Sequence, residues 1–154
     1  MVSITQIAQS VDIGVVKDAG LLLNDPLIYG AILLVLALAG TREKKKLGRI
    51  LFSLALAALL GLAAKEAFSH ERPCSGEEWC PGGYSFPSSH AVTAFALMAA
   101  FIRRKEYPAY MLFALFVSFT RMNIGVHVFQ DIVAALPIAL IAYYVTWIVV
   151  GDED

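Results

Sequence analysis

Long apolar runs separated by short polar segments dominate the sequence from residue 26 onward. In chain order they predict membrane-crossing helices at 26–39, 50–68, 88–102, 107–120 and 127–150. Basic residues up to position 46 extend the first run, because their aliphatic stems can lie along a helix end. Asn24, Asp25 and Pro26 form a helix start, with a capping side chain followed by proline. The pattern predicts an all-α membrane bundle with about five crossings.

Residues 1–20 show a different pattern, in which apolar side chains recur at helical spacing among polar ones. The apolar positions are Ile4, Ile7, Ala8, Val11 and Val15. They predict an amphipathic helix on the membrane surface, with a loosely ordered tail as the alternative. A secretory signal is disfavoured, because no basic residue precedes the apolar part and no long apolar core follows it. We expect this surface helix at 1–20 and one integral membrane domain at 21–154.

Composition and charge placement favour a location in the cell membrane. Of 154 residues 58% are hydrophobic, and the mean hydropathy is +0.68, which is too apolar for a water-soluble globule. Five of the twelve Lys and Arg residues fall at 42–49 and three at 103–105, as in cytoplasmic loops. The amino terminus is then outside and the acidic tail 151–154 inside. We expect membrane lipids, and no nucleic acid, as partners.

Ionisable side chains interrupt the apolar pattern again near its end. If the helix begins near residue 126, His127 and Asp131 share one face, so the carboxylate can hold one imidazole nitrogen and leave the other free. Arg121 precedes them by one short Asn-Gly loop, so we expect it to fold back over the same histidine with a planar guanidinium suited to a phosphate. A histidine and an aspartate at this spacing are more often a structural pair than a catalytic one. Other segments of the chain must therefore decide whether this pair is catalytic.

Two further cations lie where the second predicted crossing ends. Lys65 and Arg72 are separated by about two helical turns, so both can face one target, and Pro73 disfavours helix just before it. The alternative is that Lys65 only extends to the outer lipid headgroups.

Pro87, Ser88, Ser89 and His90 open the third predicted crossing. A helix start presents free backbone N–H groups and the positive end of the helix dipole to an anion. Capping alone explains the serines but not a histidine at the edge of an apolar helix. The predicted helix is about 22 Å long against a hydrocarbon core of about 30 Å, so the anion site should be recessed near the outer headgroups.

The chain has two cysteines, Cys74 and Cys80, in the largest outer loop. On a side that faces an oxidising compartment they favour a disulfide, with two free thiols as the alternative. A zinc site would need more ligands than this loop supplies. We therefore expect no metal and no other cofactor.

Three motifs follow one another along the chain: Lys65-x6-Arg72-Pro73, Pro87-Ser88-Ser89-His90 and Arg121-x5-His127-x3-Asp131. Together they resemble the signature of the type 2 phosphatidate phosphatase superfamily, which also includes soluble acid phosphatases and vanadium-dependent haloperoxidases. Ser89 stands where this family usually has glycine, and Thr120 where serine usually precedes the arginine. Membrane members commonly have one crossing more, so the surface helix here would replace the first.

The resemblance implies a phosphate-binding set and a catalytic set. The first consists of Lys65, Arg72 and Arg121, which resemble the cations on the phosphate oxygens, with Ser88 and the backbone of Ser89. In the second, His127 matches the nucleophile that takes up the phosphoryl group, Asp131 the carboxylate that orients it, and His90 the acid that protonates the leaving group. Fixed cations and a helix start can stabilise the charge of this reaction without a metal.

The matching residues lie at the outer ends of the predicted crossings, where a lipid can present its phosphate by lateral diffusion. The resemblance therefore implies a lipid phosphate or diphosphate phosphatase that acts through a phosphohistidine. An isoprenoid diphosphate such as undecaprenyl or dolichyl diphosphate is the first choice of substrate, and phosphatidate or phosphatidylglycerol phosphate the second. Two alternatives remain: a non-catalytic protein that binds or passes an anionic lipid, and a vanadate-dependent haloperoxidase, which a small membrane-buried site disfavours.

Overall fold

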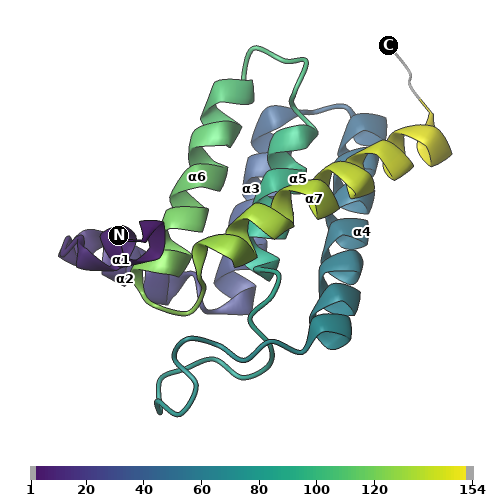
Figure 1. Cartoon of the computed structure of the whole chain (residues 1–154). Coiled ribbons are helices and arrows are strands. Elements are labelled where there is room, and N and C mark those ends of the chain that lie inside the picture. Colours follow the sequence, from purple (N-terminus) through teal and green to yellow (C-terminus); the bar gives the residue numbers. More distant parts are fainter. Residues whose placement is uncertain (1–2, 152–154) are drawn as a thin grey trace.

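The computed structural model describes residues 3–151, which form helices and loops without a strand. The helices are α1 (Ile4–Ser10), α2 (Gly14–Leu22), α3 (Pro26–Gly40), α4 (Lys44–Phe68), α5 (Ser89–Ala99), α6 (Tyr107–Asn123) and α7 (Phe129–Val150). Figure 1 shows α3, α4, α5 and α6 standing side by side, with α7 crossing them obliquely and α1 and α2 at one end. The predicted all-α membrane bundle is confirmed.

Helix α5 is the centre of this bundle and packs against α3, α4, α6 and α7. Every residue from Ala91 to Ala99 is buried. Four of these nine residues are alanines, whose small side chains let the surrounding helices approach closely. The start of α5 is thereby held inside one end of the bundle.

Two helices, α4 and α7, are long and apolar enough to cross a membrane by themselves. A third crossing is added if α2 and α3, which meet at a bend of 95°, form one broken span. α5 and α6 have 11 and 17 residues, which correspond to about 16 and 25 Å of helix. The count of five crossings therefore stays a prediction.

Several helix boundaries differ from the predicted ones, with consequences for the site. α4 begins at Lys44, so the basic residues at 44–49 form its first turns. α6 continues to Asn123, which makes Arg121 helical, and α7 begins only at Phe129, which leaves His127 in the preceding loop.

The amino-terminal segment is two helices and not the single helix predicted over 1–20, whose first two residues lie outside the described range. Val11 and Ile13, between α1 and α2, have extended backbones. The side-chain amide of Asn123 donates to the carbonyl oxygens of Ala8 and Val11, at 2.7 and 2.8 Å. These bonds satisfy carbonyl groups at the end of α1 and fix the break.

Apolar side chains remain exposed on this pair of helices, among them Ile4, Ile7 and Val15. Exposed apolar residues beside polar ones are typical of a helix at a membrane surface, so that location stays a prediction.

The long loop 69–88 and the short loop 124–128 lie at the same end of the bundle as α1 and α2 (Figure 1). The loops at 41–43 and 100–106, which flank or contain the basic clusters, lie at the other end. The fold thus separates the predicted site residues from the basic clusters.

Candidate active site

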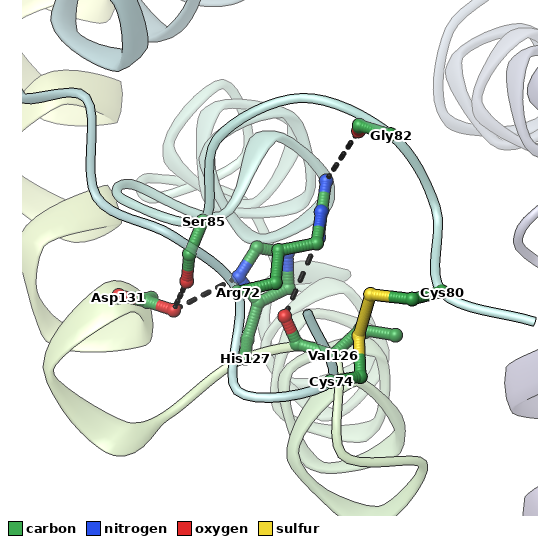
Figure 2. Close-up of a disulfide and its surroundings, with 8 residues drawn as sticks. All are labelled: Arg72, Cys74, Cys80, Gly82, Ser85, Val126, His127 and Asp131. Atoms are coloured by element: carbon green, nitrogen blue, oxygen red, sulfur yellow. Dashed lines mark hydrogen bonds and ion pairs between the residues drawn. A yellow bond between two sulfur atoms is a disulfide. The ribbon is translucent and has the colours of Figure 1, made fainter. Parts of the chain in front are cut away.

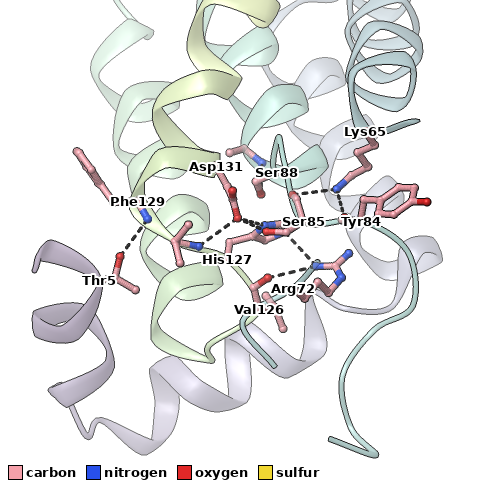
Figure 3. A network of polar contacts seen from close by, with 12 residues as sticks. Thr5, Lys65, Arg72, Tyr84, Ser85, Ser88, Val126, His127, Phe129 and Asp131 are labelled. Carbon is pink, nitrogen blue, oxygen red and sulfur yellow. Dashed lines mark hydrogen bonds and ion pairs between the residues drawn. The ribbon is translucent and has the colours of Figure 1, made fainter. Parts of the chain in front are cut away.

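His127 and Asp131 form the centre of a buried polar network at the end of the bundle that carries the loops 69–88 and 124–128 (Figure 3). His127 Nδ1 lies 3.0 Å from Asp131 Oδ2. We expected the two residues on one helical face, but His127 precedes α7. Asp131 is the third residue of α7 and reaches back, accepting also from the N–H of Val128 at 3.1 Å. The expected contact is present, but a helix-capping geometry makes it.

The other ring nitrogen of His127 faces Arg72 (Figure 2). Its Nε2 is 3.3 Å from Arg72 Nη1, which also donates to the Val126 carbonyl at 3.3 Å. Arg72 Nη2 donates to the Gly82 carbonyl at 3.4 Å. Because a carboxylate can only accept, His127 carries its proton on Nδ1, which leaves Nε2 unprotonated beside a positive charge.

A disulfide constrains the loop that carries Arg72. Cys74 and Cys80 are bonded, with their Cα atoms 5.6 Å apart, and Figure 2 shows the bridge between Arg72 and Gly82 along the loop. The N–H of Ser75 also donates to the Arg72 carbonyl, at 3.0 Å. The cross-link and this turn restrict the segment that positions the guanidinium.

Ser85 belongs to the network although we did not predict it. Its hydroxyl donates to Asp131 Oδ2, and the residue is 2% exposed. Lys65 Nζ donates to the carbonyls of Tyr84 and Ser85, at 2.5 and 3.1 Å. Lys65 therefore faces the site and holds the loop segment that carries the serine, as Figure 3 shows.

Ser88 and Ser89 start α5 beside the start of α7. The Ser88 N–H donates to the Asp131 carbonyl at 3.1 Å, and its hydroxyl accepts from the Ala91 N–H at 3.4 Å. Ser88 is the N-cap and Ser89 the first helical residue. The bond between Ser88 and Asp131 fixes this helix start relative to the His127 loop.

His90 turns toward the connection between α2 and α3. Its Nε2 is 2.8 Å from the Leu23 carbonyl oxygen, and its ring packs against Tyr29 at 4.4 Å between centroids. The Tyr29 hydroxyl donates to the His90 carbonyl at 2.8 Å. Within residues 3–151 no hydrogen bond joins His90 to His127, so the structure directs the expected acid away from the expected nucleophile.

Arg121 faces the same connection and does not fold over His127 as we expected. It donates to Asn24 Oδ1 at 2.6 Å and to the Gly20 carbonyl, and it is 1% exposed. The reason is that α6 continues past Arg121, so its side chain leaves a rigid helix toward the two acceptors of residues 20–24.

Two guanidinium groups of the site keep a donor without an acceptor. The Nε atoms of Arg72 and Arg121 are buried, and neither has a hydrogen-bond partner among the described residues. Buried donors are nearly always paired, so these two indicate space for an acceptor that is not part of the chain. Over residues 3–151, no group of three or more His, Cys, Asp or Glu residues could hold a metal.

The electrostatic surroundings keep His127 neutral. Burial lowers the pKa of His127 to about 4, and the positive charges of Arg72 and Lys65 add to this effect, while the hydrogen bond to Asp131 opposes it. At neutral pH the imidazole therefore needs no deprotonation before it can act as a nucleophile.

Sequence reasoning missed Ser85, Asn24 and Tyr29 as neighbours of the site. Asn24 was assigned only to the helix start, where Asp25 in fact accepts from the N–H groups of Leu27 and Ile28. A tyrosine in an apolar run and a serine in an irregular loop carry no periodic signal, so contact in the folded chain was needed to find them.

An oriented neutral imidazole beside buried cations with unfilled donors, at one end of a membrane helix bundle, is a site suited to a phosphoryl group. Among known families, a sequence profile of the PAP2 superfamily matches residues 46–154. The match covers well over half of the chain, so the chain belongs to the PAP2 superfamily and is a membrane phosphatase of that family. The resemblance drawn from the three motifs is thereby confirmed.

Solved structures agree with this assignment at the level of the fold. LpxE from Aquifex aeolicus is similar over 92% of this chain and 91% of its own, with a TM-score of 0.73 and 19% identity. The transmembrane PAP2 type phosphatidylglycerolphosphate phosphatase from Bacillus subtilis is similar over 92% of this chain and 80% of its own, with a TM-score of 0.70 and 16% identity. A comparison with curated protein sequences returned no significant match.

Proposed function

We propose that the chain hydrolyses the phosphate or diphosphate group of a membrane lipid through a phosphohistidine at His127, without a metal. The observation that carries this proposal is the geometry of the imidazole. Asp131 holds Nδ1 at 3.0 Å, and the unprotonated Nε2 lies 3.3 Å from the guanidinium of Arg72. A phosphoryl group attacked by Nε2 would therefore have a fixed cation beside its oxygens.

The reaction divides into two displacements. In the first, His127 Nε2 forms a bond to phosphorus, the bond to the leaving oxygen breaks, and His90 gives that oxygen a proton, which requires the imidazolium form that the negative charge of a bound phosphate favours. In the second, water attacks phosphorus, the bond to Nε2 breaks, and His90 takes up the proton that water loses. Between the two displacements, the phosphorylated ring of His127 carries a positive charge, which Asp131 stabilises.

The phosphate oxygens would be bound by Arg72, Arg121 and Lys65, with the side chain of Ser88 and the backbone of Ser89. The unfilled Nε donors of the two arginines support this assignment, since each is a buried donor that an anion could satisfy. Arg121 can bind it while it keeps its bonds to Gly20 and Asn24, because those bonds use its Nη atoms.

A lipid is the favoured substrate because the site lies at one end of membrane-crossing helices. Isoprenoid diphosphates such as undecaprenyl or dolichyl diphosphate remain our first choice. Phosphatidate and phosphatidylglycerol phosphate remain the second, and the name of the Bacillus subtilis neighbour supports phosphatidylglycerol phosphate in particular. Phosphate release measured with a panel of these lipids in detergent gives a kcat/KM for each lipid, and these values rank the candidate substrates.

The experiment that tests the mechanism compares two histidines. His127→Ala should abolish phosphate release, whereas His70→Ala, which changes an exposed histidine, should retain it. Wild-type turnover should persist in EDTA and stop with vanadate, and quenched enzyme should carry an acid-labile, base-stable phosphate. Turnover that needs added magnesium, or that survives in His127→Ala, would refute the proposal.

Two other outcomes would support the alternatives. Saturable lipid binding without any turnover would indicate a binding or transport protein, and halide oxidation by vanadate-loaded protein would indicate a haloperoxidase.

We also propose that the site faces the outside of the cell and the carboxyl terminus the cytoplasm. The basic segment at the start of α4 and that at 103–105 lie at the opposite end from His127, as cytoplasmic loops would. After reduction, Cys74 or Cys80 should react with a membrane-impermeant thiol reagent added to intact cells. Labelling only after the cells are lysed would reverse this orientation.

A further inference from the structure

A polar cavity lies at the end of the bundle remote from His127. It has a volume of about 270 Å³ and is enclosed by the first turns of α4, the turn after α5 and the last turns of α7. Along α4, 19 residues separate Lys46 in this cavity from Lys65 in the candidate active site. That separation corresponds to about 28 Å of helix, so the two sites lie near opposite membrane surfaces.

Four of the ten described residues that line the cavity are cationic. Its four cationic lining residues are Lys46, Arg49, Arg103 and Arg104, and no Asp or Glu within residues 3–151 lines it. Arg49 donates to the Gly151 carbonyl at 2.9 Å, and Arg104 to the Gly40 carbonyl at 3.0 Å. These bonds hold both guanidinium groups in place, and Lys46 pairs at 3.1 Å with Glu43, whose side chain is largely exposed.

Ser53 supplies a second, independent sign of a missing ligand. It lines the cavity and is 2% exposed, and its hydroxyl has no hydrogen-bond partner in the described part of the chain. Serine and threonine in a helix commonly donate to the carbonyl four residues earlier, as Ser118 and Thr146 do here at 2.7 Å each. The unpaired hydroxyl of Ser53 therefore indicates an acceptor that occupies the cavity.

We propose that this cavity binds the phosphate of an anionic phospholipid headgroup, from the leaflet opposite the candidate active site. Basic pockets between membrane helices bind such headgroups, and the volume is slightly below the range of about 300–1,000 Å³ that suits whole drug-sized ligands. Tyr143 and Trp147 complete the lining, as aromatic residues do at headgroup level. Arg49, Arg104 and Lys46 bind the phosphate oxygens, and the hydroxyl of Ser53 donates to one of these oxygens.

Trp147 provides a direct measurement, because it lines the cavity and the chain has only one other tryptophan. In a Trp79→Phe background, the full-length protein in a neutral detergent is titrated with three probes below micelle-forming concentration. They are dihexanoyl phosphatidylglycerol, dihexanoyl phosphatidylcholine and inorganic phosphate. We expect a saturable change in Trp147 fluorescence with phosphatidylglycerol, none with phosphatidylcholine, and affinity for inorganic phosphate at least about tenfold weaker.

Two lysines of the same helix give a matched pair of variants. Lys46→Gln should weaken phosphatidylglycerol binding about fivefold, the loss expected for one basic residue at a headgroup. Lys44→Gln makes the same change at an exposed position outside the cavity and should leave the affinity unchanged. Ser53→Ala should weaken binding several-fold while thermal unfolding of the unliganded protein stays the same, because that hydroxyl has no partner to lose.

Several results would overturn the proposal. Equal affinity for phosphatidylcholine, or equal losses in Lys44→Gln and Lys46→Gln, would show that no specific headgroup site exists. Inorganic phosphate binding as tightly as phosphatidylglycerol would assign the cavity to a free anion. Residues 152–154 are Asp, Glu and Asp. Binding that appears only after these residues are deleted would assign the cavity to the chain's own acidic end.

Discussion

Replacement of Asp131 by asparagine is the sharpest test of the catalytic geometry. Oδ2 of Asp131 accepts from three donors: His127 Nδ1 at 3.0 Å, the Val128 N–H at 3.1 Å and the Ser85 hydroxyl. Asparagine has nearly the same size but no charge. A hydrogen bond to a charged group contributes about 1.5–3 kcal/mol and a neutral one about 0.5–1.5, so the bond that orients His127 weakens by about 1–2 kcal/mol.

The amide also offers a donor where the carboxylate offered only acceptors. If it donates to Nδ1, the proton of His127 moves to Nε2, the atom that must attack phosphorus. The weakened bond and the changed tautomer together should lower kcat by about 10- to 100-fold. Asp131 does not contact the phosphate in this mechanism, so KM should change little.

Ser85→Ala provides the graded comparison. It removes one neutral donor to the same carboxylate and leaves the charge in place, which corresponds to about 1 kcal/mol, or a decrease in kcat of about fivefold. Both variants are measured by phosphate release at saturating lipid, with protein amounts checked by circular dichroism. Wild-type kcat in Asp131→Asn, or a larger loss in Ser85→Ala than in Asp131→Asn, would refute the reasoning.

Three further predictions concern stability and charge. Replacing Cys74 and Cys80 by serine should lower the free energy of unfolding by about 2 kcal/mol, as denaturant titrations with and without reductant would show, and equal stability would contradict this. Asn123→Ala should speed amide hydrogen exchange in residues 4–11 but not in α5, since the break after α1 loses its amide bonds. In NMR titrations His127 should remain neutral until the pH falls to about 4. Between pH 6.5, the ordinary pKa of histidine, and about pH 4, the unfolded chain binds a proton that the folded chain does not. The folded chain therefore loses stability as the pH falls through this window. A titration midpoint of His127 near 6.5 would contradict the burial argument.

The apolar helices and several residues of the candidate site were predictable because each leaves a local pattern. Apolar runs give the helices, and Lys65, Arg72, His127 and Asp131 stand out because charged groups are costly within or beside such runs. Their spacing could then be matched to a known signature. Helix ends were less predictable, since capping and tertiary contacts decide them.

Contacts between distant segments were beyond the sequence argument. The amide of Asn123 ends α1 although 112 residues separate it from Val11 along the chain. Ser85 reaches Asp131 from an irregular loop, where no periodicity selects one hydroxyl over another. Arg121 was assigned to His127 by proximity along the chain, whereas a rigid helix directs it to residues 20–24.

The segment before the matched family region takes part in building the site. The superfamily match begins at residue 46, yet His90 and Arg121 are held by groups at 20–24. Leu23 provides a carbonyl to the proposed acid, and Asn24 binds one of the proposed phosphate-binding cations. Because α1 is fastened to α6 by Asn123, the position of this connection depends on the amino-terminal helices as well as on the core. A substrate that displaces or tightens residues 20–24 would therefore act on the acid and on one cation together, which couples the amino-terminal helices to the proposed phosphoryl transfer.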